Sequence, residues 1–116
     1  MNNNNLRIPK KFKLFSTTIN VVFDNRRMED KKLFGEFDSA MNKITLCDMY
    51  AGEEVVAERV SDTFYHEKVH AILDAMNEKD LNNNEKFVDL FAKLLRQSDE
   101  TAEFEEQYSP RPLQAG

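Results

Sequence analysis

Hydrophobic and polar residues alternate with a period near two in the first half of the chain. β-Branched and aromatic residues predict a first strand, most clearly over Thr18–Phe23, and the polar residues 24–27 end it. Two further short apolar segments, Leu33–Asp38 and Lys43–Asp48, are separated by residues 39–42, which is the pattern of a hairpin. We therefore expect a small three-stranded sheet, antiparallel or mixed.

The period changes to about 3.6 residues after Gly52, and the second half of the chain predicts helices. A long helix is expected from about residue 53 to about residue 76, because apolar residues at steps of three and four share one face. The Asn-rich segment 77–84 interrupts it, since Asn favours turns and helix N-caps. A second helix with an apolar stripe is expected from about residue 85 to about residue 98. The predicted fold class is α+β, with the sheet packed against two helices.

Length and composition limit the organisation to one domain. The chain has 116 residues, which is enough for one modest core but not for two. The Asn run and Pro9 near the start predict a flexible arm over residues 1–11, and the acidic residues 99–116 predict a disordered tail. The domain itself is then expected over residues 12–98.

Charge and cysteine content remove several classes of function. The formal net charge is -5, which gives no electrostatic footprint for nucleic acid or an anionic membrane. The single cysteine, Cys47, excludes an intrachain disulfide framework and a Cys-rich zinc site, and we assign it no role. No apolar run approaches the ~20 residues of a spanning helix, and the first residues do not resemble a signal peptide. A cytoplasmic protein with no direct nucleic-acid or membrane partner is expected.

The long predicted helix carries the sequence His66-Glu67-Lys68-Val69-His70, an H-E-x-x-H pattern that uses both histidines of the chain. Residues four apart stand one above the other on a helix, so His66 and His70 could bind one divalent ion. Glu67 lies about 100° further round the helix axis and could reach a water on that ion. The spacing therefore favours a zinc site, whereas a surface pair of histidines without metal is the simpler alternative.

A third ligand has to come from another segment, because one straight helix offers only two good positions to a tetrahedral ion. Glu85 is the best candidate, since it opens the second helix after a short interruption that lets this helix return beside the first. It could instead merely complement the helix dipole. Asp89, four residues further on, could replace Glu85 or orient a ligand from behind it, and Asp74 and Glu78 are poorer choices.

Several segments taken together resemble small phage and prophage zincins, which are similar to the ImmA/IrrE family of metallopeptidase domains. The likeness covers roughly residues 18–98. It rests on the strand pair Glu36–Asp38 and Ile44–Leu46, on Tyr65–Leu73 with its H-E-x-x-H, and on Asn84–Val88. The resemblance implies a minimal zincin-like fold.

The same resemblance implies a phage- or prophage-encoded zinc metallopeptidase that hydrolyses a protein or peptide substrate. His66, His70 and Glu85 would bind Zn²⁺, and Glu67 would be the general base that activates a water. A substrate would pair with a sheet edge near the metal, for which Lys43–Asp48 is our candidate strand.

Three candidates for stabilising the oxyanion, Tyr50, Tyr65 and Arg96, are weak on sequence grounds, and none stands out. This gap keeps a second hypothesis open, a zinc-stabilised protein-interaction module with little hydrolytic activity. A third is a metal-free helical adaptor with an exposed histidine pair. Substrate, cleavage site and oligomeric state are not encoded in any pattern that we recognise.

Overall fold

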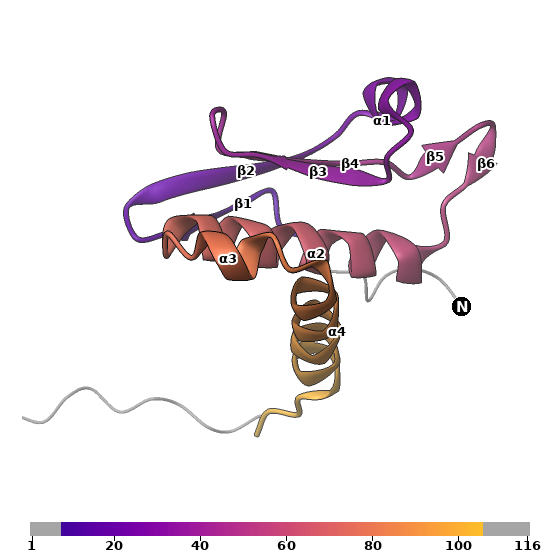
Figure 1. Ribbon diagram of the computed structural model, residues 1–116. Coiled ribbons are helices and arrows are strands. Elements are labelled where there is room, and N and C mark those ends of the chain that lie inside the picture. The colour runs from indigo at the N-terminus through magenta and orange to yellow at the C-terminus, as the bar shows by residue number, and fades with distance from the viewer. Residues whose placement is uncertain (1–7, 106–116) are drawn as a thin grey trace, which may run out of the picture.

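The computed structural model describes residues 8–105, which form an α+β domain with a mixed four-stranded sheet and a small two-stranded ribbon (Figure 1). The elements in chain order are β1 (Lys11–Leu14), β2 (Thr17–Phe23), α1 (Asn25–Lys31), β3 (Gly35–Asp38), β4 (Lys43–Leu46), β5 (Met49–Tyr50), β6 (Glu53–Glu54), α2 (Ala57–Ala75), α3 (Lys79–Asn82) and α4 (Glu85–Thr101). The α+β class predicted from the sequence is confirmed.

The main sheet has the strand order β1-β2-β4-β3, so β3 is an edge strand and β4 is central. The predicted hairpin is present as the antiparallel pair β3 and β4, and β2 runs parallel to β4. Two expectations were therefore wrong. The sheet has four strands rather than three, and Lys43–Asp48 contributes a strand that is covered on both sides instead of an edge.

The first strand, β1, begins at the last residue of the expected flexible arm, Lys11. Phe12 and Leu14 pack against the core while Lys11 and Lys13 remain exposed, which is the alternation of a half-buried strand. Ile8 also packs against this core. The arm prediction for residues 1–11 was wrong for residues 8–11, and residues 1–7 lie outside the described part of the chain.

Helix α1 replaces the polar break that we expected after the first strand. The Asp24 side chain accepts a hydrogen bond from the Arg27 backbone N–H, which caps the helix N-terminus. Met28 is fully buried and is the anchor of this helix. Because only one residue of α1 is buried, the segment carries no helical periodicity that a sequence pattern could detect.

Helix α2 carries the predicted H-E-x-x-H and packs across the sheet. It begins at Ala57 instead of residue 53, because residues 53 and 54 form β6. The sheet-side core is a cluster of buried residues from β2, β4 and α2: Ile19, Val21, Ile44, Leu46, Val60 and Phe64. Met76, at the predicted end of this helix, lies just beyond Ala75 and is 55% exposed.

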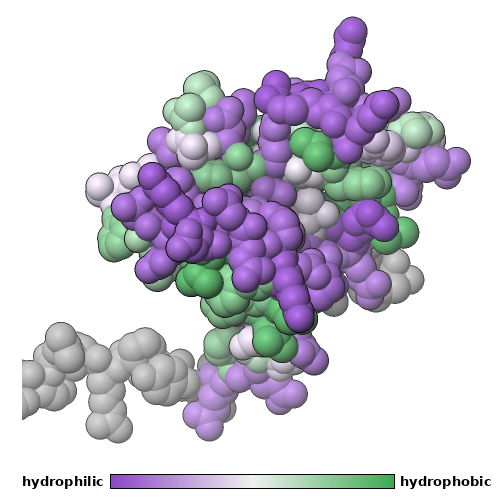
Figure 2. Space-filling model, in the orientation of Figure 1, coloured by the Kyte–Doolittle hydropathy of each residue, from purple (hydrophilic) through white to green (hydrophobic). Residues whose placement is uncertain are grey.

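Helix α4 crosses α2 on its other side and projects away from the sheet (Figure 1). A second core cluster joins the two helices and contains Val69, Leu73, Val88 and Ala92. Phe91 and Leu94 of the predicted apolar stripe are instead exposed, and Figure 2 shows hydrophobic surface on α4 below the polar surface of α3.

The C-terminal end of α4 extends to Thr101, three residues beyond the predicted end at Ser98. Two hydrogen bonds to α2 accompany the extension: the Tyr65 hydroxyl donates to Asp99 over 2.9 Å, and the Ser61 hydroxyl donates to Glu100 over 2.8 Å. The predicted disordered tail therefore begins too early at residue 99, and residues 106–116 lie outside the described part of the chain.

Within residues 8–105, no helix combines the length and the apolar character that crossing a bilayer requires.

Candidate metal centre

The H-E-x-x-H residues lie on a strip of α2 between its two buried faces. Phe64 faces the sheet-side cluster and Val69 faces α4, and the two histidines and Glu67 occupy the sector between them. Each histidine is partly buried, with 24% of the His66 side chain and 19% of the His70 side chain exposed. The strip therefore opens at the border of a core and not on a fully solvated face.

Glu85 completes a group of three ligand-type side chains with His66 and His70. Its Oε1 lies 3.1 Å from His66 Nε2, and its Oε2 lies 3.3 Å from His70 Nε2. One ligand atom from each of the three side chains falls within 4.8 Å of the others. The sequence had selected these three residues, and the fold brings them together as α4 begins beside the middle of α2.

The spacing and chemistry of these atoms fit a zinc ion. Two ligands at Zn²⁺ bond lengths near 2.1 Å in a tetrahedral arrangement lie about 3.4 Å apart, close to both measured separations. Two imidazole nitrogens with one carboxylate oxygen form a set typical of catalytic zinc, in which a fourth position stays open. The residues present therefore fit the ion.

Both histidines meet a polar partner on the ring nitrogen that faces away from Glu85. His70 Nδ1 lies 2.5 Å from Asn82 Oδ1, and His66 Nδ1 lies 3.7 Å from Asp89 Oδ1. A partner on Nδ1 favours the tautomer that leaves Nε2 free to bind a metal. Glu85 belongs to the group of three with the two histidines, whereas Asp89 lies on the Nδ1 side of His66 and also accepts a hydrogen bond from Lys93 over 3.1 Å.

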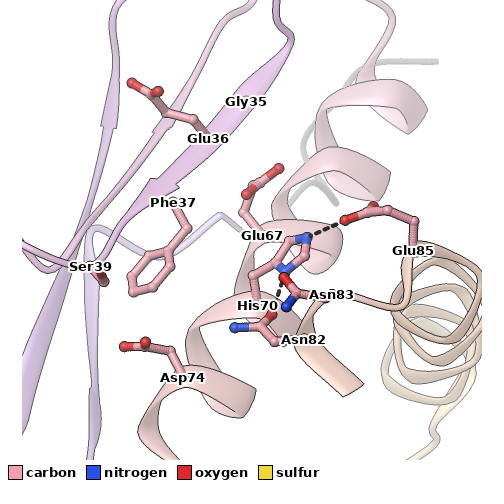
Figure 3. A pocket seen from close by; sticks show the side chains of 10 residues that line it. All are labelled: Gly35, Glu36, Phe37, Ser39, Glu67, His70, Asp74, Asn82, Asn83 and Glu85. Carbon is pink, nitrogen blue, oxygen red and sulfur yellow. Dashed lines mark hydrogen bonds and ion pairs between the residues drawn. The ribbon is translucent and has the colours of Figure 1, made fainter. Parts of the chain in front are cut away.

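Glu67 is a largely buried carboxylate beside the candidate metal centre. Burial raises the pKa of its carboxyl above the usual value, although His66, His70 and a backbone hydrogen bond from Phe37 act in the opposite direction. The side chain lines the same pocket as His70 and Glu85 (Figure 3). A carboxylate with a raised pKa beside a candidate metal site is the environment of a general base.

A pocket of about 420 Å³ lies between α2 and the edge strand β3, and the α3 region closes one side of it. Figure 3 shows the residues that line it: Gly35, Glu36, Phe37, Ser39, Glu67, His70, Asp74, Asn82, Asn83 and Glu85. At Gly35 an added Cβ would lie 2.5 Å from the Thr63 side chain, so glycine permits the close approach of β3 to α2. The pocket thus places two of the three ligand-type residues, His70 and Glu85, beside the edge strand β3.

The three oxyanion candidates from the sequence are engaged elsewhere. Tyr65 donates to Asp99, and its burial together with this bond raises its pKa to about 12. Tyr50 stacks on Phe34, with 4.7 Å between ring centroids. Arg96 donates to Glu100 and also pairs with Asp62. None of the three lines the pocket.

Two pocket residues escaped the sequence analysis as functional groups. Asn82 belongs to the four-residue helix α3, inside a segment that we had treated as a polar interruption. Phe37 is one residue of a hairpin strand whose place at the sheet edge depends on distant pairing. Asp74 and Glu78, the poorer choices for a metal ligand, both lie outside the group of three. Asp74 lines the pocket, and Glu78 does not.

Comparisons of the chain with protein-family models, with curated proteins and with solved structures gave no match.

Proposed function

We propose that the protein is a zinc-dependent hydrolase that cleaves a peptide bond in a protein substrate, with a minimal zincin-like arrangement of sheet edge and helix. The observation that supports this most is the convergence of His66 Nε2, His70 Nε2 and both Glu85 carboxylate oxygens. Glu67 is not needed to hold the metal, and it lies in the adjoining pocket.

His66, His70 and Glu85 would hold Zn²⁺, and Asn82 and Asp89 would fix the orientation of the two imidazoles. A zinc ion with three protein ligands supplies Lewis-acid activation of water and of the substrate carbonyl. Glu67 would accept a proton from the attacking water and later transfer it to the leaving amine. The raised pKa of Glu67 suits both accepting and releasing the proton, because it lies closer to neutral pH than the pKa of an ordinary carboxyl.

The edge strand β3 would position the substrate. Its inner side pairs with β4, and the sheet order leaves the other side of β3 without a neighbouring strand among the described residues. An extended peptide could pair with this side through main-chain hydrogen bonds and lie over the pocket. Gly35, Glu36 and Phe37 of β3 line the pocket, so such a peptide would pass close to Glu67 and His70.

A zinc-stabilised interaction module is the second candidate, and one observation favours it. The side chains expected to stabilise an oxyanion, Tyr50, Tyr65 and Arg96, are all absent from the pocket lining. Such a module would retain the metal and the peptide-binding edge but would turn over substrate slowly, because oxyanion stabilisation contributes a large part of the rate.

Glu67→Gln separates the two candidates. The wild-type chain, loaded with one equivalent of zinc, is incubated with a mixture of random octapeptides, and new amino termini are counted by mass spectrometry. We expect cleavage by the wild type and a loss of about 10²-fold or more in Glu67→Gln, with unchanged zinc content. Glu58→Gln, an exposed acid on the same helix, is the matched control. Equal activity of wild type and Glu67→Gln would contradict the proposal.

A further inference from the structure

The pocket beside the candidate metal centre has an unusual charge distribution. Four carboxylate residues line it, and no lysine or arginine does: Glu36, Glu67, Asp74 and Glu85. Carboxylates at this density repel one another unless a cation compensates them. The role of each one therefore has to be considered separately.

Three of the four carboxylates are accounted for. Glu85 and Glu67 serve the proposed metal and proton transfer. Glu36 points away from the other pocket residues in Figure 3, and it accepts from Arg27 Nε over 2.6 Å and from Lys31 Nζ over 2.7 Å. The two positive charges of a bound Zn²⁺ would balance the negative charges of Glu67 and Glu85. The basic side chains of α1 already balance the charge of Glu36. Asp74 is the remaining carboxylate, and it is exposed at the mouth of the pocket.

An aspartate at position 74 lowers the stability of the helix that carries it, α2. It lies in the last turn of α2, where the helix dipole disfavours a negative side chain, and that turn contains no basic residue. Within residues 8–105 its carboxylate makes no hydrogen bond and no ion pair. Local stability therefore does not explain an aspartate at this position.

The surroundings of Asp74 suit a long basic side chain. Figure 3 shows its carboxylate at the end of the pocket opposite Glu85, next to the Phe37 ring and Ser39. An aromatic ring can cover the methylene stem of a lysine or stack with an arginine while the charged end reaches a carboxylate. Asp74 follows His70 by four residues, which is ~6 Å along the helix, or about two residues of an extended peptide.

We propose that Asp74 is a specificity-determining residue that selects substrates with a lysine or arginine about two residues from the scissile bond. This assignment rests on the proposed function, because it takes the position of the reacting bond from the candidate metal centre. Asp74 touches neither the metal nor the reacting atoms. It acts by ion pairing with the substrate.

Binding can be tested without turnover. Zinc-loaded Glu67→Gln protein is equilibrated with random octapeptide mixtures in which one position is fixed as Lys, Arg, Gln or norleucine, at low ionic strength to limit screening. We expect Lys and Arg at one position to be retained about threefold better than Gln, the size typical of an exposed ion pair. Asp74→Asn should abolish this preference, and Asp74→Lys should lower the retention of Lys and Arg below that of Gln.

Asp80→Asn, an exposed acid on α3 outside the pocket lining, should leave the preference unchanged. Thermal unfolding supplies a second readout: Asp74→Asn should be as stable as the wild type or slightly more stable, whereas a purely structural role predicts a loss. Equal retention of all four mixtures, retention of none, or a preference that persists in Asp74→Asn would overturn the assignment.

The two proposals fail in different ways. Zinc-loaded wild type that cleaves peptides without a basic preference would retain the hydrolase function and overturn the Asp74 assignment. A protein that binds basic peptides through Asp74 but cleaves none would overturn the hydrolase function, and Asp74 would then be a residue that binds basic side chains and not one that selects substrates.

Discussion

The two faces of α2 are packed to different extents. On the sheet side, residues of two neighbouring strands and the helix form a cluster that includes the fully buried ring of Phe64. On the other side, a smaller cluster holds α4, and Val88 and Ala92 are the only buried residues that α4 contributes to it. Buried apolar area sets the hydrophobic contribution, so the sheet side should be much the more stable of the two.

The candidate metal centre draws on both faces. His66 and His70 come from α2, which both clusters hold, whereas Glu85 comes from the first turn of α4, which depends on the smaller cluster. A metal bound by all three would add to the weaker contact. If zinc binds there as proposed, it would do more than supply reactivity, because it would also fix α4 against the rest of the domain.

The sheet-side cluster gives the largest expected effect. Phe64→Ala should lower the free energy of unfolding by about 3–5 kcal/mol, since it removes an aromatic side chain that is 2% exposed. The whole domain should lose stability, including the sheet. Urea unfolding followed by far-UV circular dichroism measures the change, and a loss below about 1 kcal/mol would contradict the importance that we give to this face.

The corresponding truncation on the other face is Val88→Ala, which should cost about 2 kcal/mol. Unlike Phe64→Ala, it should loosen α4 selectively and leave the sheet protected. Amide hydrogen exchange compares the two variants residue by residue. If Val88→Ala raises exchange equally in β4 and α4, the two faces unfold as one unit, and the contrast between them disappears.

Most of the helices and strands on the two sides of α2, although not the order of the strands, could be predicted from the sequence. The period-3.6 pattern indicated α2 and α4, and the hairpin of β3 and β4 followed from two short apolar segments. The parallel pairing of β2 with β4 was not predictable, because it joins strands across α1 and β3 and no local pattern encodes strand order. The alternating Lys11–Leu14 segment did carry a strand signal, which its basic residues obscured.

The site shows the same division. Residue spacing alone selected His66, His70 and Glu85, because helical geometry fixes the first two and the start of the second helix suggests the third. Asn82 was missed, since its role depends on how a one-turn helix folds back onto α2. The edge position of Phe37 likewise depends on strand order. Sequence reasoning thus found the ligand-type residues but not the groups that surround them.

A smaller effect concerns the support of His70. Asn82→Ala should weaken zinc binding by about 10- to 100-fold, because Nδ1 of the imidazole loses the partner that favours the metal-binding tautomer. Competition with a chromogenic chelator measures this affinity. Asn83→Ala, which changes the neighbouring pocket residue, is the control and should bind zinc like the wild type. Equal zinc affinity of the wild type and Asn82→Ala would show that Asn82 does not position His70.

The smallest effect is a pH dependence of the α4 contact. Burial and the hydrogen bond to Asp99 raise the pKa of Tyr65 from 10.0 to about 12, so the folded state holds this proton more tightly than the unfolded state. The resulting stability is present below pH 10.0 and is lost as the pH rises toward 12. Between these pH values, the free energy of unfolding of the zinc-free chain should fall more steeply with pH for wild type than for Tyr65→Phe. Parallel plots of this free energy against pH would contradict the prediction.

The zinc content of the purified chain tests the central claim most directly. The protein is purified without chelator or affinity metal, reconstituted with zinc and desalted, and metal per chain is measured by inductively coupled plasma mass spectrometry. Glu85→Ala is measured in parallel, with Lys86→Ala, its exposed neighbour, as the control. We predict about one zinc per chain for wild type and Lys86→Ala and a clear reduction for Glu85→Ala. Wild-type protein that retains no zinc would contradict the metal centre and the function built on it.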